Sequence, residues 1–109
     1  MMNQGVDILS PLDNEIWYTS SDGNVVAPHK TSVFGANIIS NTYENSKGVI
    51  VFDSPVTSIG DSAFLSCTKL ISIELKGTIE QWNAISKGDN WNKNIPATVV
   101  HCTDGDVEL

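Results

Sequence analysis

The spacing of apolar residues in the stretch 56–75 constrains the fold more than any other feature of the chain. Apolar side chains recur there first every three or four residues and then every two residues: Ile59, Ala63, Phe64, Cys67, Leu70, Ile73 and Leu75. The first spacing is typical of a helical turn and the second of a strand. A segment that turns, makes one helical turn and enters a strand is typical of one unit of a solenoid. Such units bind and scaffold other molecules and rarely catalyse reactions.

The strand part of this stretch has counterparts earlier and later in the chain. Ile50 lies 23 residues before Ile73, and Val100 lies 27 residues after it. Both offsets fall within the ~20–29-residue period of leucine-rich repeats. We therefore predict a three-rung parallel ladder with three inward-facing pairs, Ile50/Phe52, Ile73/Leu75 and Val100/Cys102.

Turn residues predict hairpins in the first half of the chain. Asp22-Gly23 separates the strand-like runs 16–19 and 24–27, which predicts an N-terminal β-hairpin. The run 37–43 and the β-prone run 49–52 flank the turn 45–48 and predict a second hairpin.

A helix and a third hairpin are expected after the ladder stretch. Thr78 and Gln81 have the spacing of a capping box, and Ile79, Trp82 and Ile85 share one helical face. Gly88 is the expected end of this helix. Asp104-Gly105 then predicts a turn, after which 107–109 returns as an edge strand. Helix and hairpin together would cap the ladder.

These elements predict one domain in a mostly β, α+β class, built as a short leucine-rich-repeat-like solenoid. Residues 1–14 form a polar N-terminal arm, and residues 15–109 form the domain. The domain divides into an N-terminal cap (15–48), the repeat (49–76) and a C-terminal cap (77–109).

The composition narrows the possible partners. The 109 residues carry a net charge of −7, which disfavours nucleic acid as a partner. No run of ~18 apolar residues is present, so no membrane insertion is expected. Residues 1–12 lack a basic segment followed by an apolar one, so no signal peptide is visible. Cys67 and Cys102 are expected to be buried thiols, with a single disulfide as the alternative.

The stretch 56–75 closely resembles the BspA-type leucine-rich repeat of gut and mouth bacteria. The residues that carry the resemblance are Val56, Thr57, Ser58, Ile59, Gly60, Ala63, Phe64, Cys67, Leu70 and Ile73. The tail, with Trp82, Trp91 and Val100-His101-Cys102, resembles the capping segment of the same family. The resemblance implies a non-catalytic, cell-surface or secreted protein that binds host proteins or other cells.

An alternative function follows from what the chain lacks. It holds one full repeat and shows no export signal, which favours a structural or decoration component of a larger assembly, such as a phage particle. A surface or secreted location is expected if an export signal has been removed; otherwise the protein is expected in a virion or inside the cell. A protein partner is expected in either case, and an oligomer is compatible with both.

No set of residues predicts an enzyme or a metal site. His29 and His101 have no second His or Cys at metal spacing apart from the adjacent Cys102, and neighbours on a strand point to opposite faces. Asp104-Gly105-Asp106 is better explained as a turn than as a calcium loop. No nucleophile elbow or phosphate-binding glycine loop is present. We therefore expect no catalytic residues, no cofactor and no metal.

The candidate binding residues are aromatic. Trp17 and Tyr18 are neighbours on a predicted strand, so one of them must face outward. Trp91 lies in a loop and is the third candidate, whereas Trp82 belongs to the apolar face of the predicted helix.

Overall fold

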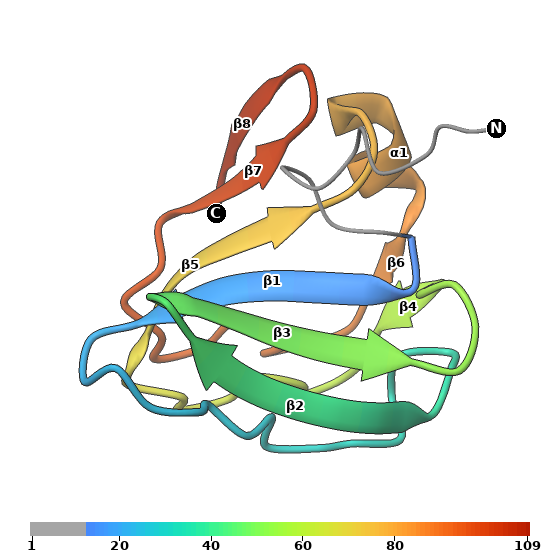
Figure 1. The fold of residues 1–109 in the computed structure, drawn as a ribbon. Coiled ribbons are helices and arrows are strands. Elements are labelled where there is room, and N and C mark those ends of the chain that lie inside the picture. The colour runs from blue at the N-terminus through green and yellow to red at the C-terminus, as the bar shows by residue number, and fades with distance from the viewer. Residues whose placement is uncertain (1–12) are drawn as a thin grey trace, which may run out of the picture.

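The computed structural model describes residues 13–109 and builds them into eight strands and one helix (Figure 1). The elements are β1 (Glu15–Ser20), β2 (Ile38–Glu44), β3 (Lys47–Phe52), β4 (Ser58–Ile59), β5 (Leu70–Leu75), α1 (Ile79–Ala84), β6 (Ser86–Lys87), β7 (Val99–Cys102) and β8 (Gly105–Glu108). Residues 1–12 of the predicted arm lie outside the described residues. Asn14 belongs to the domain, because its carbonyl accepts from Phe52 N at 2.8 Å.

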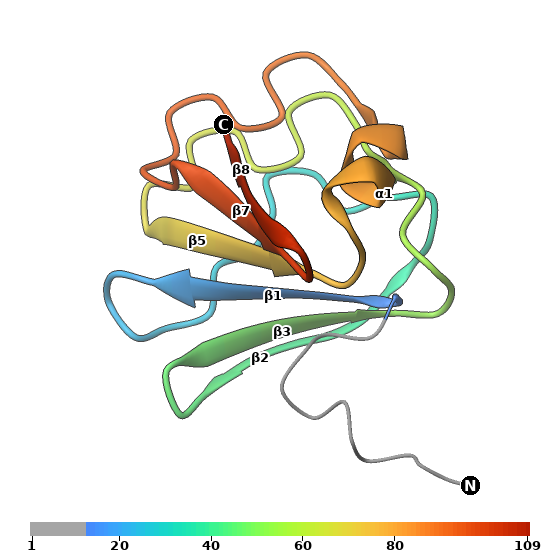
Figure 2. The ribbon, with the colours of Figure 1, turned by 90° about the horizontal axis from the view of Figure 1, so that it is seen from above.

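Six of the described strands form one mixed sheet in the order β2-β3-β1-β5-β7-β8. Every neighbouring pair in it is antiparallel except β5 and β7. The short strands β4 and β6 form a separate parallel pair. The connecting loops and α1 lie on one side of the large sheet (Figure 2).

The predicted solenoid with a three-rung parallel ladder is wrong. β1 lies between β3 and β5 and pairs antiparallel with both, so that Ile16 has Ile50 on one side and Leu75 on the other. Ile16 is fully buried and occupies the middle of this three-strand group. Ile50 and Ile73, which are 23 residues apart, therefore both face inward but lie on β3 and β5, two strands that do not pair with each other. The offset of 27 does match a strand pairing, because Ile73 is the partner of Val100.

Two of the three predicted hairpins are confirmed. β2 and β3 pair around a two-residue turn, and β7 and β8 pair around Thr103-Asp104, one residue earlier than the predicted turn at Asp104-Gly105. The N-terminal hairpin around Asp22-Gly23 is wrong, because residues 24–27 form no strand. Both edges of β1 are taken by β3 and β5, which leaves no place for a strand from the segment that follows β1.

The capping box at the start of the helix is confirmed, but the predicted C-terminal cap of a ladder, of which the helix would be part, is wrong. The Thr78 side chain accepts from Gln81 N at 3.1 Å, and Gln81 Oε1 accepts from Thr78 N at 2.8 Å. α1 ends at Ala84, ahead of the expected stop at Gly88, because Ile85 is extended and leads the chain into β6. The helix thus connects β5 to β6 and forms no C-terminal helix cap.

Loops cover the inner face of the sheet and run side by side. Phe64 N donates to Trp91 O at 2.8 Å, and Ser62 N donates to Asp89 O at 3.0 Å. Within 60–66 the chain forms turns instead of the predicted helical turn, with left-handed backbone at Ser62 and Ser66. The spacing of three and four in this stretch therefore arises from successive turns.

A row of aromatic rings joins the sheet to these loops. Its members in order are Phe52, Phe34, Phe64, Trp91 and Trp82, with successive ring centroids 5.2, 5.6, 6.5 and 5.8 Å apart. All five side chains are buried. The core thus lies entirely between the inner face of the sheet and the loops.

Candidate binding surface

Strand alternation gives the large sheet an outer face that is turned away from this core. On β1, Ile16 and Tyr18 point inward, so Trp17 points outward beside its pairing partners Val49 and Glu74. The other residues of this outer sheet face follow from the same registers. They are Glu15 and Thr19 of β1; Ser40, Thr42 and Glu44 of β2; Lys47 and Val51 of β3; Ser72 of β5; Val99 and His101 of β7; and Asp106 and Glu108 of β8.

Trp17 is half-buried and lies between two charged side chains. Its indole Nε1 donates to Glu15 Oε1 at 3.0 Å, and Lys47 Nζ lies 3.8 Å from the ring centroid. A cation at this position is attracted to the face of the ring. Both contacts hold the indole in one orientation on the sheet.

A hollow of about 300 Å³ opens beside this ring. Its walls include Trp17, Ser46 and Lys47 on one side and Ser72 and Glu74 on the other. The hollow combines an aromatic wall with hydroxyl, ammonium and carboxylate groups. It can therefore accept a side chain that has an apolar body and a polar end.

The other two candidate aromatics are not exposed. Tyr18 is 2% exposed and points into the core, and Trp91 is 8% exposed within the aromatic row. Burial raises the pKa of the Tyr18 hydroxyl, which donates to Asn41 Oδ1 at 2.7 Å. Of the three candidates, Trp17 alone is placed on the surface.

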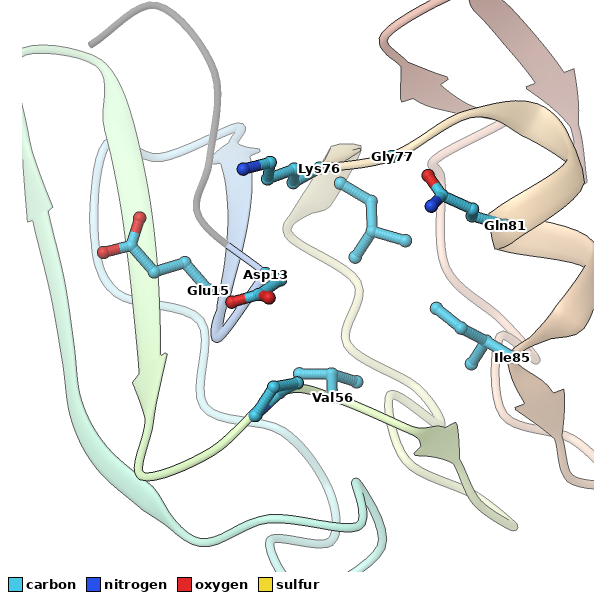
Figure 3. A pocket seen from close by; sticks show the side chains of 9 residues that line it. Asp13, Glu15, Val56, Lys76, Gly77, Gln81 and Ile85 are labelled. Atoms are coloured by element: carbon cyan, nitrogen blue, oxygen red, sulfur yellow. The ribbon is translucent and has the colours of Figure 1, made fainter. Parts of the chain in front are cut away.

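A second hollow, of about 290 Å³, lies where β1 begins and β5 ends (Figure 3). The carboxylates of Asp13 and Glu15 and the Lys76 side chain lie toward β1, while Gln81 and Ile85 extend from α1 and the residue after it. Sequence reasoning did not single out this group, because its members come from three separate segments. Its mixed polar and apolar walls provide no nucleophile paired with a base.

Of the residues considered for metal binding, His101 and Asp106 come together as a pair. Among residues 13–109, no group of three or more His, Cys, Asp or Glu side chains could hold a metal ion. His101 Nδ1 lies 2.7 Å from Asp106 Oδ1 across β7 and β8, and both side chains are exposed. The predicted turn at Asp104-Gly105 would have placed His101 opposite Glu108; the pair arises because the turn lies one residue earlier.

Both cysteines are free thiols, so the alternative of a disulfide is not realised. Cys67 and Cys102 are half-buried. Burial raises the pKa of each thiol, and the neighbouring Asp104 and Asp106 raise that of Cys102 further. Thiols with a raised pKa stay protonated and are weak nucleophiles at neutral pH.

The chain matches no protein-family model, no curated protein and no solved structure. In the part of the chain that the structure describes, no helix is long and apolar enough to span a bilayer.

Proposed function

We propose that this chain is a non-catalytic protein-binding module whose contact surface is the outer sheet face around Trp17. The observation that carries this proposal is a tryptophan held outward by Glu15 and Lys47, beside an open hollow. Tryptophan is among the residues that most often dominate the energy of protein interfaces.

The surroundings of Trp17 fit such a role. Val49 and Val51 extend the apolar surface on β3. The charged side chains of Glu15, Lys47 and Glu74 lie next to it on β1, β3 and β5. An apolar centre within a polar rim is typical of protein interfaces. A rigid sheet also loses little conformational entropy when a partner binds.

The bacterial surface is the proposed setting, on the strength of the resemblance of 56–75 to the BspA-type repeat. The resemblance suggests a host protein or another cell as the partner. The alternative proposal is a structural component of a larger assembly such as a phage particle. The uncovered edge of β2 favours it, because an open strand can join a neighbouring subunit.

The proposal is tested by measuring binding to purified host extracellular proteins and to bacterial cells. We expect saturable binding by the wild type and a loss of at least about tenfold in affinity for Trp17→Ala, which corresponds to about 1.4 kcal/mol. Val25→Ala is the control, because Val25 is an exposed apolar residue outside the outer sheet face. Thermal unfolding verifies that both variants are folded.

Equal binding by the wild type and Trp17→Ala would contradict the assignment of the surface. Conversion of a substrate faster than the uncatalysed rate in buffer without protein would contradict the non-catalytic function. Co-sedimentation with phage particles, without binding to host proteins or cells, would favour the alternative.

A further inference from the structure

The two edges of the large sheet are built differently. β8 has four residues, and two of them, Asp106 and Glu108, are acidic. Short length and charge are devices by which edge strands avoid pairing with other chains. β2 has seven residues, and Glu44 at its end is its only charged side chain. The β8 edge is protected, whereas the β2 edge is not.

The backbone of β2 is available along its outer edge. Alternate residues of an antiparallel strand hydrogen-bond the same neighbour, so the remaining residues turn their N–H and C=O groups away from β3. Within residues 13–109, no backbone hydrogen bond joins the backbone of 38–44 to any segment other than β3. Ile39, at the irregularity in the β2–β3 register, is 64% exposed.

Side chains beneath β2 hold it in an extended conformation. Asn41 Nδ2 donates to Val26 O at 2.9 Å, and Tyr43 Oη accepts from Ser20 N at 3.2 Å. Both contacts are on the inner side of the strand. They leave the outer edge unobstructed and order the strand before any partner arrives, which lowers the entropy cost of binding.

We propose that β2 is a homodimerisation edge, at which a second copy of this chain adds its own β2 antiparallel to form one continuous sheet. In this register Thr42 lies opposite Thr42 of the second copy, and Ser40 lies opposite Glu44. Threonine pairs such as the one at Thr42 stabilise neighbouring strands. The two Glu44 carboxylates then lie at opposite ends of the pair, whereas a parallel arrangement would place them side by side. The strand is therefore complementary to itself under a two-fold axis.

The charge of the chain predicts how this dimer responds to salt. Each copy carries −7, so two copies repel one another at low ionic strength. Salt screens this repulsion, while the backbone hydrogen bonds between the strands are unaffected. An edge contact buries little surface, and we expect a dissociation constant in the range of about 1–100 μM that falls as salt is added.

The test is sedimentation equilibrium of the full chain over a concentration series at low and high salt. The wild type is expected to approach the dimer mass, and Thr42→Lys and Thr42→Glu are each expected to raise the dissociation constant at least about tenfold, because like charges meet at the two-fold axis. An equimolar mixture of the two variants is expected to recover the dimer. Thr98→Lys is the control, with the same change at an exposed threonine outside β2.

Hydrogen exchange of the wild type provides a measurement that needs no variant. Amides of β2 are expected to gain protection as the concentration rises, while those of β8 do not. A wild type that stays monomeric up to about 1 mM, or a dimer that Thr42→Lys and Thr98→Lys affect equally, overturns the proposal. The contact forms along the free edge of β2, and β3 separates that edge from Trp17 on β1, so a failure here leaves the function proposed for Trp17 unaffected.

Discussion

Tyr18 shows how one residue connects three segments that are distant in sequence. Its hydroxyl donates to Asn41 Oδ1 at 2.7 Å and accepts from Val26 N at 3.0 Å. Asn41 Nδ2 in turn donates to Val26 O, which closes the network between β1, β2 and the loop that joins them. The ring passes over Gly48, where an added Cβ would lie 2.2 Å from Tyr18 Cζ. Glycine at this position thus makes room for the tyrosine.

Tyr18→Phe is expected to lower the free energy of unfolding by about 1–3 kcal/mol, because it removes the hydroxyl that bonds the buried Val26 N–H and the Asn41 side-chain oxygen. Urea denaturation measures the change. Tyr43→Phe is the matched control, since the Tyr43 hydroxyl accepts a single bond of 3.2 Å. A loss at Tyr18 no larger than that at Tyr43 would show that the network contributes little.

The raised pKa of Tyr18 predicts a loss of stability in alkali. Below pH 10.0, its usual pKa, the hydroxyl is protonated in both the folded and the unfolded chain, so its contribution is fully present. Above that value the unfolded chain ionises first, and the contribution is lost as the pH rises through the folded pKa. Unfolding free energies measured between about pH 8 and pH 11 should fall more steeply for the wild type than for Tyr18→Phe. Parallel slopes would contradict this effect.

Among the elements, the β2–β3 hairpin illustrates what local sequence can determine. Asn45 and Ser46 both have left-handed backbone, with φ of 54° and 64°. This is the geometry of the two-residue turn that joins twisted strands, and it favours Asn followed by Gly. The turn predicted from the sequence lies at the correct place but covers 45–48 instead of 45–46, because glycine is a common turn residue and Gly48 was included. In the structure Gly48 lies within β3 under the Tyr18 ring.

Ser46→Gly is expected to raise the free energy of unfolding by about 0.5–1 kcal/mol, because glycine adopts the left-handed backbone without the clash that an L side chain makes. Thermal or urea unfolding measures the gain. Ser32→Gly is the control, since Ser32 is exposed and is not among the residues with positive φ. The control should be neutral or destabilising, and a gain of the same size there would contradict the assignment to turn geometry.

At the scale of the whole molecule, Phe64 joins the loops that cover the sheet to one another. It is 1% exposed and lies in the middle of the aromatic row, next to Phe34 and Trp91. Its backbone N–H also bonds the neighbouring loop through Trp91 O. The stretch 56–75 therefore does supply a core residue, although the stretch is not a unit of a solenoid.

Phe64→Ala is expected to cost about 3–5 kcal/mol of stability, because it removes a buried ring and leaves a cavity between two layers. The measurement is equilibrium unfolding in urea. Leu65→Ala, at the half-buried next residue, should cost clearly less. A loss below about 1 kcal/mol for Phe64→Ala would mean that the ring is not part of the core.

The local features were predictable and the strand order was not. The second and third hairpins, the capping box at Thr78 and the offset of 27 between Ile73 and Val100 each depend on residues close in sequence or on one strand pairing. The position of β1 depends on two pairings across long stretches of chain. Alternation showed that one of Trp17 and Tyr18 faces outward, but it could not show which.

The sequence by itself determined where the main strands, turns and helix start lie, because these follow from side-chain periodicity and turn chemistry within a few residues. Only the tertiary structure decided that β1 separates β3 from β5, that Tyr18 enters the core over Gly48, and that Trp17 faces outward. The physical reason is that side-chain periodicity specifies which side of a strand is apolar but does not specify which strands pair with it. Those neighbours are selected by the packing of side chains from distant segments, and the same packing leaves β2 at an open edge.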